Sequence, residues 1–219
     1  MTSYHIKRFL LDVVYPNKCP FCNEVISHNQ FYCPACPENL GLFEGEPEPL
    51  ENIAGTFAVF KYSDRTSPFV YTIKEGGNAY AVSAAAKLLG DKIGAVQFDI
   101  ITCIPTDSVR MRERGYNPPA LISKEISLIT GISCDLKLLA KTRRTEIQKS
   151  LSAIERHENL RGAFEIGKKG GTIPKTVLLV DDVRTTGATL LEAAACLLSS
   201  GAEKVYAAVV AVVERGSLY

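Results

Sequence analysis

Two adjacent acids and a run of hydroxyl residues follow an apolar stretch late in the chain. Residues 177–189 read VLLVDDVRTTGAT. The first four residues are uninterrupted and apolar, which predicts a strand buried on both faces of a parallel sheet. Asp181 and Asp182 then fall at the carboxyl end of that strand. Open α/β sheets bind ligands at this end, so the two carboxylates are expected to point into a crevice.

The residues after the acids predict a site for one phosphate group. We expect a turn over 184–187 (RTTG) and an Ala- and Leu-rich helix from Ala188 to Ser199, with Gly201 as its C-terminal cap. The start of a helix presents backbone N–H groups and the positive end of its dipole to an anion. Paired carboxylates beside a monophosphate can accept hydrogen bonds from the 2- and 3-hydroxyls of a ribose. The expected ligand is therefore ribose 5-phosphate.

The same stretch lacks the glycine patterns of dinucleotide-binding folds and of nucleoside triphosphatases. It resembles the phosphoribosyl pyrophosphate (PRPP) signature of type I phosphoribosyltransferases, in which two acids precede a Thr-Thr-Gly turn. The alternative is an ordinary strand, loop and helix. The resemblance implies that PRPP contacts Asp181, Asp182, Val183, Arg184, Thr185, Thr186, Gly187, Ala188 and Thr189.

Two CxxC pairs near the amino terminus predict a metal site. Cys19 and Cys22 form the first pair, and Cys33 and Cys36 form the second. Four thiolates fill a tetrahedral site and leave no open position, which predicts structural zinc. Disulfides and a redox CxxC are the alternatives. The first 14 residues carry charges and lack the apolar core of a secretory signal, so we expect a reducing, cytoplasmic compartment.

Three basic segments are expected around the same crevice. The first, TDSVRMRERGYN over 106–117, can bring guanidinium groups to a pyrophosphate; a solvated basic turn is the alternative. The second, 141–161, can close over pyrophosphate as a flexible loop, or it forms a charged surface helix. The third, 74–77 (KEGG), is expected to be a turn. The candidate pyrophosphate ligands are Lys74, Arg110, Arg114, Gly115, Arg143 and Arg156.

The elements that position these residues alternate between strands and helices. Strands are expected over Phe57–Phe60, Phe98–Ile104 and Lys204–Val213, and helices over Ala79–Leu89 and Ser123–Thr130. This alternation predicts an α/β fold, a mostly parallel sheet flanked by helices. Residues 56–219 would form this domain. Residues 1–41 would hold an amphipathic helix, over 6–14, and the zinc module, and the acidic, proline-containing segment 42–55 would link the two.

Composition excludes several function classes. The chain has 219 residues, of which 46% are hydrophobic, and its formal net charge is +1 at pH 7. Its apolar runs are too short to span a bilayer, and the charge gives no overall attraction to nucleic acid. Cys103, Cys134 and Cys196 stand singly in apolar surroundings, where a cysteine is usually a small buried hydrophobe.

Taken together, the motifs resemble the ComF family of bacterial competence proteins over nearly the whole chain. Pro118 and Pro119 depart from the family, which commonly has a Gln after the RGYN motif, and this departure puts Asn117 in question as a ligand. The resemblance rests on the paired CxxC, FKY at 60–62, IK at 73–74, RGYN at 114–117, Gln148, Leu151, Arg156, Asn159, GAF at 162–164 and DDVRTTGAT at 181–189.

The resemblance implies a PRPP-binding protein that handles single-stranded DNA during transformation with a helicase-like partner. It also implies Mg²⁺ bound with PRPP and is compatible with a homodimer. In the leading hypothesis Asp181, Asp182 and Arg114 are catalytic, and ribose 5-phosphate is transferred to an acceptor with release of pyrophosphate. In the alternative, the fold senses PRPP or binds a single strand or a helicase without transfer, using basic clusters and interleaved tyrosines. These tyrosines are Tyr62, Tyr71, Tyr80 and Tyr116.

Overall fold

The computed structural model describes residues 17–27, 29–76, 78–94, 96–142, 162–167 and 172–214. The expected amphipathic helix over 6–14 lies outside the described residues. So do most of the basic segment 141–161, including Arg143 and Arg156. Within the described residues, no helix combines the length and the apolar character needed to cross a membrane.

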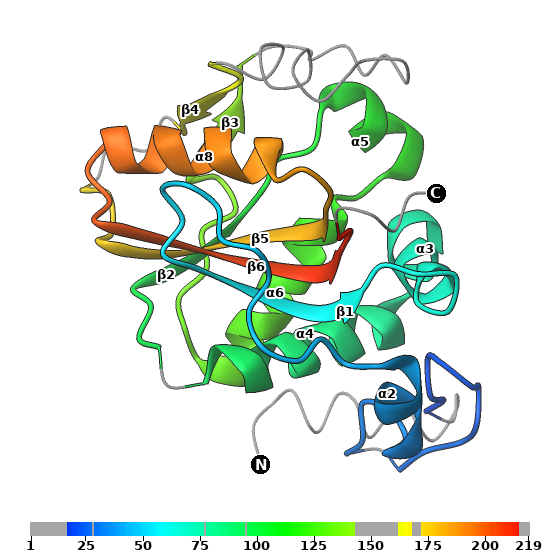
Figure 1. The fold of residues 1–219 in the computed structure, drawn as a ribbon. Helices are drawn as coiled ribbons and strands as arrows, with labels where there is room; N and C mark the ends of the chain where they lie inside the picture. Colours follow the sequence, from blue (N-terminus) through cyan, green and yellow to red (C-terminus); the bar gives the residue numbers. More distant parts are fainter. Residues whose placement is uncertain are drawn as a thin grey trace.

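A parallel sheet forms the centre of the fold (Figure 1), with the strand order β1-β6-β5-β2. Its strands are β1 (Gly55–Lys61), β2 (Ile100–Cys103), β5 (Thr176–Arg184) and β6 (Lys204–Val212). All three neighbouring pairs are parallel. Residues 177–180 are fully buried, as expected for a strand covered on both faces. The strands predicted from the apolar runs are confirmed, although β2 is shorter than expected.

Helices cover both faces of the sheet. Helices α4 (Ala79–Ile93) and α6 (Pro118–Thr130) lie on one face, and α8 (Ala188–Ser199) lies on the other (Figure 1). The side chain of Asn78 caps α4 by accepting hydrogen bonds from the N–H groups of Tyr80 and Ala81. The core is correspondingly divided into two clusters of buried apolar residues. The predicted layered α/β arrangement is confirmed.

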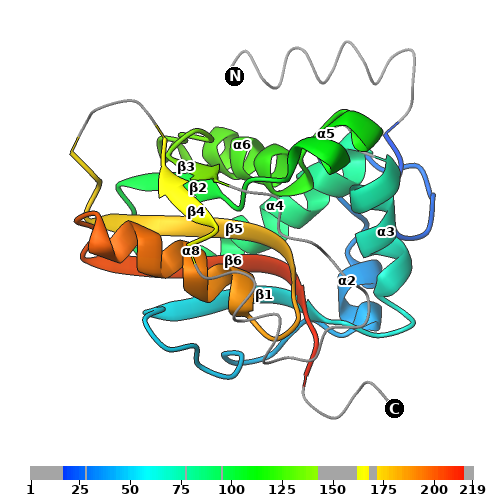
Figure 2. The same ribbon diagram turned by 90° about the horizontal axis from the view of Figure 1, so that it is seen from above.

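Two short helices lie where the strands end. Helices α3 (Ser67–Gly76) and α5 (Ser108–Arg114) occupy the edge of the sheet at which α8 begins (Figures 1 and 2). The turn expected from Lys74 is wrong, because α3 continues through Gly76 and Lys74 lies in its last turn. The solvated basic turn is also wrong as a description of 108–114, because Asp107 caps α5 there and Gly115 ends it with a φ of +77°.

Helix α6 starts earlier than the sequence indicates. Pro118 and Pro119 occupy its first two positions, directly after Asn117. Proline suits this place because the first N–H groups of a helix have no partner within the helix and its fixed φ is already helical. The departure from the family pattern is therefore accommodated as a helix start.

Residues 42–54 pack against the sheet. Leu42 pairs with Phe60 in an isolated bridge, and the N–H of Phe43 donates to the carbonyl of Val59 at 2.7 Å. Phe43 and Ile53 are buried in the core cluster on the α8 side. The remaining described elements are helix α2 (Ala35–Leu40) and an antiparallel ribbon of β3 (Leu139–Lys141) and β4 (Phe164–Ile166).

Candidate functional site

The acid pair lies where β5 extends beyond the end of β2. The last β5 residue paired with β2 is Val180, whereas the pairing with β6 continues to Arg184. Asp181 and Asp182 therefore have a strand neighbour on one side only. The N–H of Asp182 donates to Oδ1 of Asp181 at 2.8 Å, which holds that carboxyl close to the backbone.

The two acids do not ionise independently. Burial, and next the neighbouring charge of Asp182, raise the pKa of Asp181 to about 8; the N–H of Asp182 and the cations of Lys74 and Lys141 oppose this rise. Near neutral pH the carboxyl of Asp181 therefore holds a proton. A protonated carboxyl can donate as well as accept a hydrogen bond, which suits a ligand with hydroxyl groups.

Lys74 lies beside the acid pair. Its Nζ is 3.4 Å from Oδ2 of Asp182, and both side chains are mostly shielded from solvent. The sequence analysis expected this lysine near an anion, and the nearest anionic atoms that the structure gives it are these carboxylate oxygens. It reaches them from the last turn of α3.

Lys141 is a site residue that the sequence analysis did not select. It ends β3, and burial lowers its pKa, while the charges of Asp107 and Asp181 raise it. The charge of Arg110 also lowers this pKa, so Lys141 lies within electrostatic reach of two acids and of Arg110. The feature of the sequence that could have indicated Lys141 is its position as the first residue of the most basic segment.

The hydroxyl-rich turn leads into α8 as predicted. Thr185 and Thr186 are exposed, and Oγ1 of Thr186 accepts from the N–H of Ala188 at 3.4 Å. Gly187 precedes the helix with a φ of +83°, a left-handed conformation that favours glycine. The first turn of α8 presents backbone N–H groups at the same end of the sheet as the acid pair. This arrangement can bind a phosphate.

The RGYN segment joins neighbouring elements. Nη2 of Arg114 is 2.6 Å from Oε1 of Glu75 in α3. The hydroxyl of Tyr116 donates to the carbonyl of Lys74 at 2.9 Å, and Nδ2 of Asn117 donates to the carbonyl of Ile104 at 3.0 Å. Arg110 is another candidate pyrophosphate ligand in this region. Its Nε is 3.7 Å from Oδ2 of Asp107.

A cavity of about 640 Å³ lies between the ends of β5 and β6, beside the segment that contains Phe43 and Leu50. Its wall is part apolar and part polar, with two glutamates, an arginine and two threonines among the lining residues. Leu50 also packs on the phosphate turn, since a Cβ at Gly187 would lie 2.7 Å from its Cδ2. The cavity is lined by Phe43, Glu48, Pro49, Leu50, Arg184, Thr185, Thr186, Val212, Val213 and Glu214.

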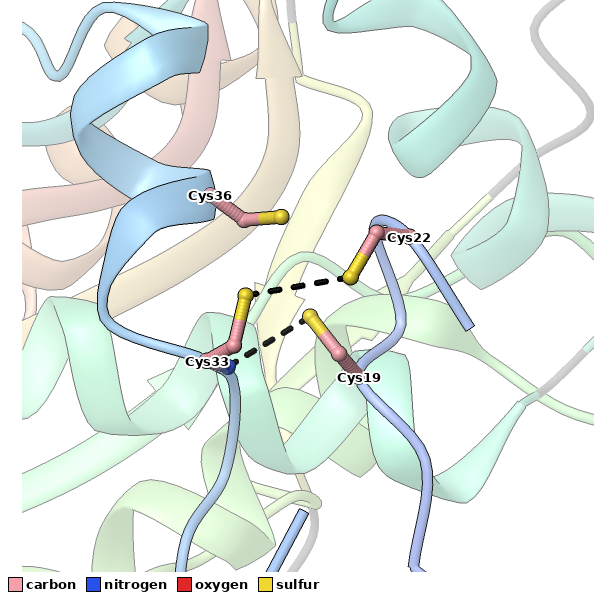
Figure 3. Close-up of side chains that lie close together, drawn as sticks. All are labelled: Cys19, Cys22, Cys33 and Cys36. Atoms are coloured by element: carbon pink, nitrogen blue, oxygen red, sulfur yellow. Dashed lines mark hydrogen bonds between the residues drawn. The ribbon is translucent and has the colours of Figure 1, made fainter. Parts of the chain in front are cut away.

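The four cysteines of the two CxxC pairs converge. Their Sγ atoms lie within 4.8 Å of one another, and Figure 3 shows them pointing toward a common centre. The Sγ atoms of Cys22 and Cys33 are 3.7 Å apart, close to the roughly 3.8 Å expected for two thiolates of a tetrahedral zinc site. Burial acts against ionisation of Cys19, but N–H groups of Cys33, Phe21 and Cys22 lower its pKa to about 7. The residues fit zinc.

Comparisons with known proteins agree with both parts of the structure. A family model described as phosphoribosyl transferase domain matches residues 48–218. The chain belongs to this family. A second model, described as double zinc ribbon domain, matches residues 10–47. The phosphoribosyltransferase domain is thus preceded by a four-cysteine zinc ribbon, which confirms the predicted fold and structural zinc.

Several proteins are similar over long stretches. DNA utilization protein YhgH of Escherichia coli (strain K12) is 29% identical over 196 residues, which cover 85% of this chain and 80% of that protein. Competence protein F of Haemophilus influenzae is 34% identical over 108 residues, or 49% and 47% of the two chains. The resemblance to the ComF family is confirmed. Among solved structures, glutamine phosphoribosylpyrophosphate amidotransferase from B. subtilis is 23% identical with a TM-score of 0.43, covering 64% of this chain and 30% of that one.

Proposed function

We propose that this ComF-family protein binds PRPP at the carboxyl end of β5. The observation that carries the proposal is the acid pair at the end of β5, at the same end of the sheet as the N-terminus of α8. Asp181 and Asp182 would hold the 2- and 3-hydroxyls of the ribose. Backbone N–H groups of residues 185–189, with the hydroxyls of Thr185, Thr186 and Thr189, would hold the 5-phosphate.

The proposed reaction is transfer of ribose 5-phosphate to an acceptor. The bond from C1 to a pyrophosphate oxygen breaks, the oxygen keeps the electron pair, and the acceptor supplies the electrons of the new bond to C1. Cations collect on the β2 side of the acid pair, where Lys74, Lys141 and Arg110 could stabilise the leaving pyrophosphate. The sequence-based role of Arg114 at this pyrophosphate remains part of the proposal.

Mg²⁺ bound with PRPP would neutralise part of the pyrophosphate charge. The carboxylate oxygens of Asp181 and Asp182 are the hard ligands that Mg²⁺ prefers. Lys74 and Lys141 would supply fixed positive charge to the same group, so the protein itself shares the task of stabilising the leaving oxygens.

The acceptor would approach from the β6 side. Direct displacement at C1 requires the leaving group and the nucleophile on opposite faces of the ribose. Lys74 lies on α3, whereas the cavity by Leu50 and Val213 lies toward the end of β6 and has Phe43, Leu50 and Val213 among its apolar lining residues. An uncharged ring system suits that wall better than a second polyanion.

Calorimetric titration with PRPP and Mg²⁺ tests the proposal. We expect binding by the wild type and its loss in the double variant Asp181→Asn, Asp182→Asn. Asp91→Asn is the matched control, because Asp91 lies on α4 and forms an ion pair with Lys87. It should bind normally. Equal PRPP affinity of the double variant and the wild type would remove the proposed role of the acids.

A second candidate function is PRPP sensing or single-strand binding without transfer, linked to the use of DNA in competence. It is favoured by the names of the relatives, DNA utilization protein and competence protein, and by Tyr71, which is 66% exposed on α3 beside the basic α5. In this proposal the protein acts in the cytoplasm with a helicase, as a monomer or homodimer. Pyrophosphate release with a panel of acceptors would favour the enzyme; oligonucleotide binding that weakens steeply with salt would favour the binding protein.

A further inference from the structure

One aromatic ring of the zinc ribbon, that of Phe21, packs against the core of the phosphoribosyltransferase domain. Phe21 lies in the chain between the zinc ligands Cys19 and Cys22. Its ring centroid is 4.3 Å from that of Phe69 and 6.0 Å from that of Phe60. Phe60 and Phe69 are 0% and 4% exposed, so the contact is made inside the larger domain.

Helix α3 connects this aromatic contact to the acid pair. Phe69 lies in its first half, and Lys74 lies in its last turn, 3.4 Å from Asp182. The last turn is also tied down by Tyr116, which donates to the carbonyl of Lys74, and by the ion pair of Glu75 with Arg114. A single helix of ten residues therefore touches the zinc ribbon with one half and the candidate ribose site with the other.

Zinc bound by Cys19 and Cys22 would fix the orientation of Phe21. Zinc holds the thiolates of Cys19 and Cys22 at fixed distances and so fixes the short turn between them. That turn carries Phe21. A change in its geometry must either move the ring against Phe69 or break the contact, because packed aromatic side chains tolerate little displacement.

We propose that zinc binding and PRPP binding are thermodynamically coupled through Phe21 and α3. Phe21 is a positioning residue: with zinc bound, it holds α3 so that Lys74 lies against Asp182. This inference rests on the proposed function and adds regulation of the same site. Coupling between two sites is reciprocal, so PRPP must tighten zinc binding by the factor by which zinc tightens PRPP binding.

The experiment uses the full chain with zinc loaded, and again after zinc removal by a chelator that is then dialysed away. PRPP and Mg²⁺ are titrated calorimetrically into both forms. We expect the affinity for PRPP to fall about fivefold or more without zinc, the lower end of typical couplings. Ribose 5-phosphate is titrated into both forms as well, and zinc affinity, measured by competition with a chromogenic chelator, should rise in its presence by the factor by which zinc tightens its binding.

Phe21→Leu separates coupling from folding, because it leaves all four zinc ligands and the acid pair in place. The zinc-loaded variant should bind zinc but bind PRPP more weakly, and its amides in residues 67–76 should exchange hydrogen faster. Val25→Ala is the control, since Val25 belongs to the same ribbon and is 68% exposed. It should keep wild-type affinities and wild-type exchange.

The possible outcomes distinguish the two proposals. If zinc-loaded wild-type protein does not bind PRPP, the proposed function fails and the coupling with it. If it binds PRPP equally well with and without zinc, only the coupling fails. Full coupling in Phe21→Leu would overturn the path through this ring. Loss of PRPP affinity in the zinc-loaded variant, with zinc affinity no longer raised by ribose 5-phosphate, would support it.

Discussion

Lys74→Met tests how the cation on α3 serves the candidate site. In the structure its Nζ is 3.4 Å from Oδ2 of Asp182, and the two side chains are 31% and 18% exposed. Methionine keeps the length and the packing of the aliphatic chain and removes only the charge. Lys74 also opposes the rise in the pKa of Asp181, so the substitution affects both acids.

The size of the effect follows from the distance. Two unit charges this far apart attract by about 5 kcal/mol at an effective dielectric constant of about 20. Desolvation and partial exposure cancel much of this, which leaves a net effect of about 1–2 kcal/mol. That corresponds to roughly a tenfold change in affinity and roughly one unit in pKa. Without the lysine, the pKa of Asp181 should move further above about 8.

Two ligands separate the possible roles of Lys74. If it acts through the acid pair, Lys74→Met should weaken ribose 5-phosphate and PRPP by a similar factor of about ten. If it contacts pyrophosphate, as the sequence interpretation has it, only PRPP binding should fall. Lys87→Met is the control, because Lys87 pairs with Asp91 on α4. Calorimetric affinities for both ligands that match the wild type would refute the reasoning altogether.

Four further substitutions test three neighbouring features. Because the pKa of Asp181 is raised from 3.8 to about 8, the folded protein holds a proton between these pH values that the unfolded chain has lost, and its stability should fall as pH rises from about 4 to about 8. Asp181→Asn should therefore raise Tm at pH 8 more than at pH 5. Equal shifts in Tm at the two pH values would contradict the assigned pKa. Gly187→Ala should lower the free energy of unfolding by about 1–2 kcal/mol, because alanine is strained at a φ of +83° and its Cβ would meet Leu50. An unchanged midpoint of unfolding in urea would be inconsistent with this geometry. Glu75→Gln should release Arg114 and preserve or tighten PRPP binding, whereas Arg114→Gln should weaken it, and weaker binding in Glu75→Gln would show that the ion pair itself matters.

The local parts of the site could be predicted from the sequence. The buried strand, the acids at its end and the start of α8 at Ala188 all follow from patterns within a few residues. The four-cysteine site is likewise encoded in short spacings. In each case neighbours in the chain are neighbours in space, so spacing alone determines which groups meet.

Contacts between distant segments could not be predicted. Lys74 lies more than a hundred positions before Asp182, and Lys141 is brought near Asp181 by a ribbon that no periodicity indicates. Helix α3 was not predicted, and a turn was expected at 74–77. Glycine in KEGG indicates a chain break, but the helix includes Gly76 before it ends, and Lys74 lies in its last turn.

In the RGYN segment, the side chains of Tyr116 and Asn117 join elements of the fold beside the candidate site. Tyr116 and Asn117 both donate to backbone carbonyls, at Lys74 and Ile104, and so join the end of α3 to the end of β2. Because the side chain of Asn117 is engaged there, it does not cap α6, and the following prolines begin that helix instead. The lack of a Gln after this motif therefore leaves its main structural task intact. The hydroxyl of Tyr116 donates to the carbonyl of Lys74, so the motif stabilises the last turn of α3, from which Lys74 contacts Asp182.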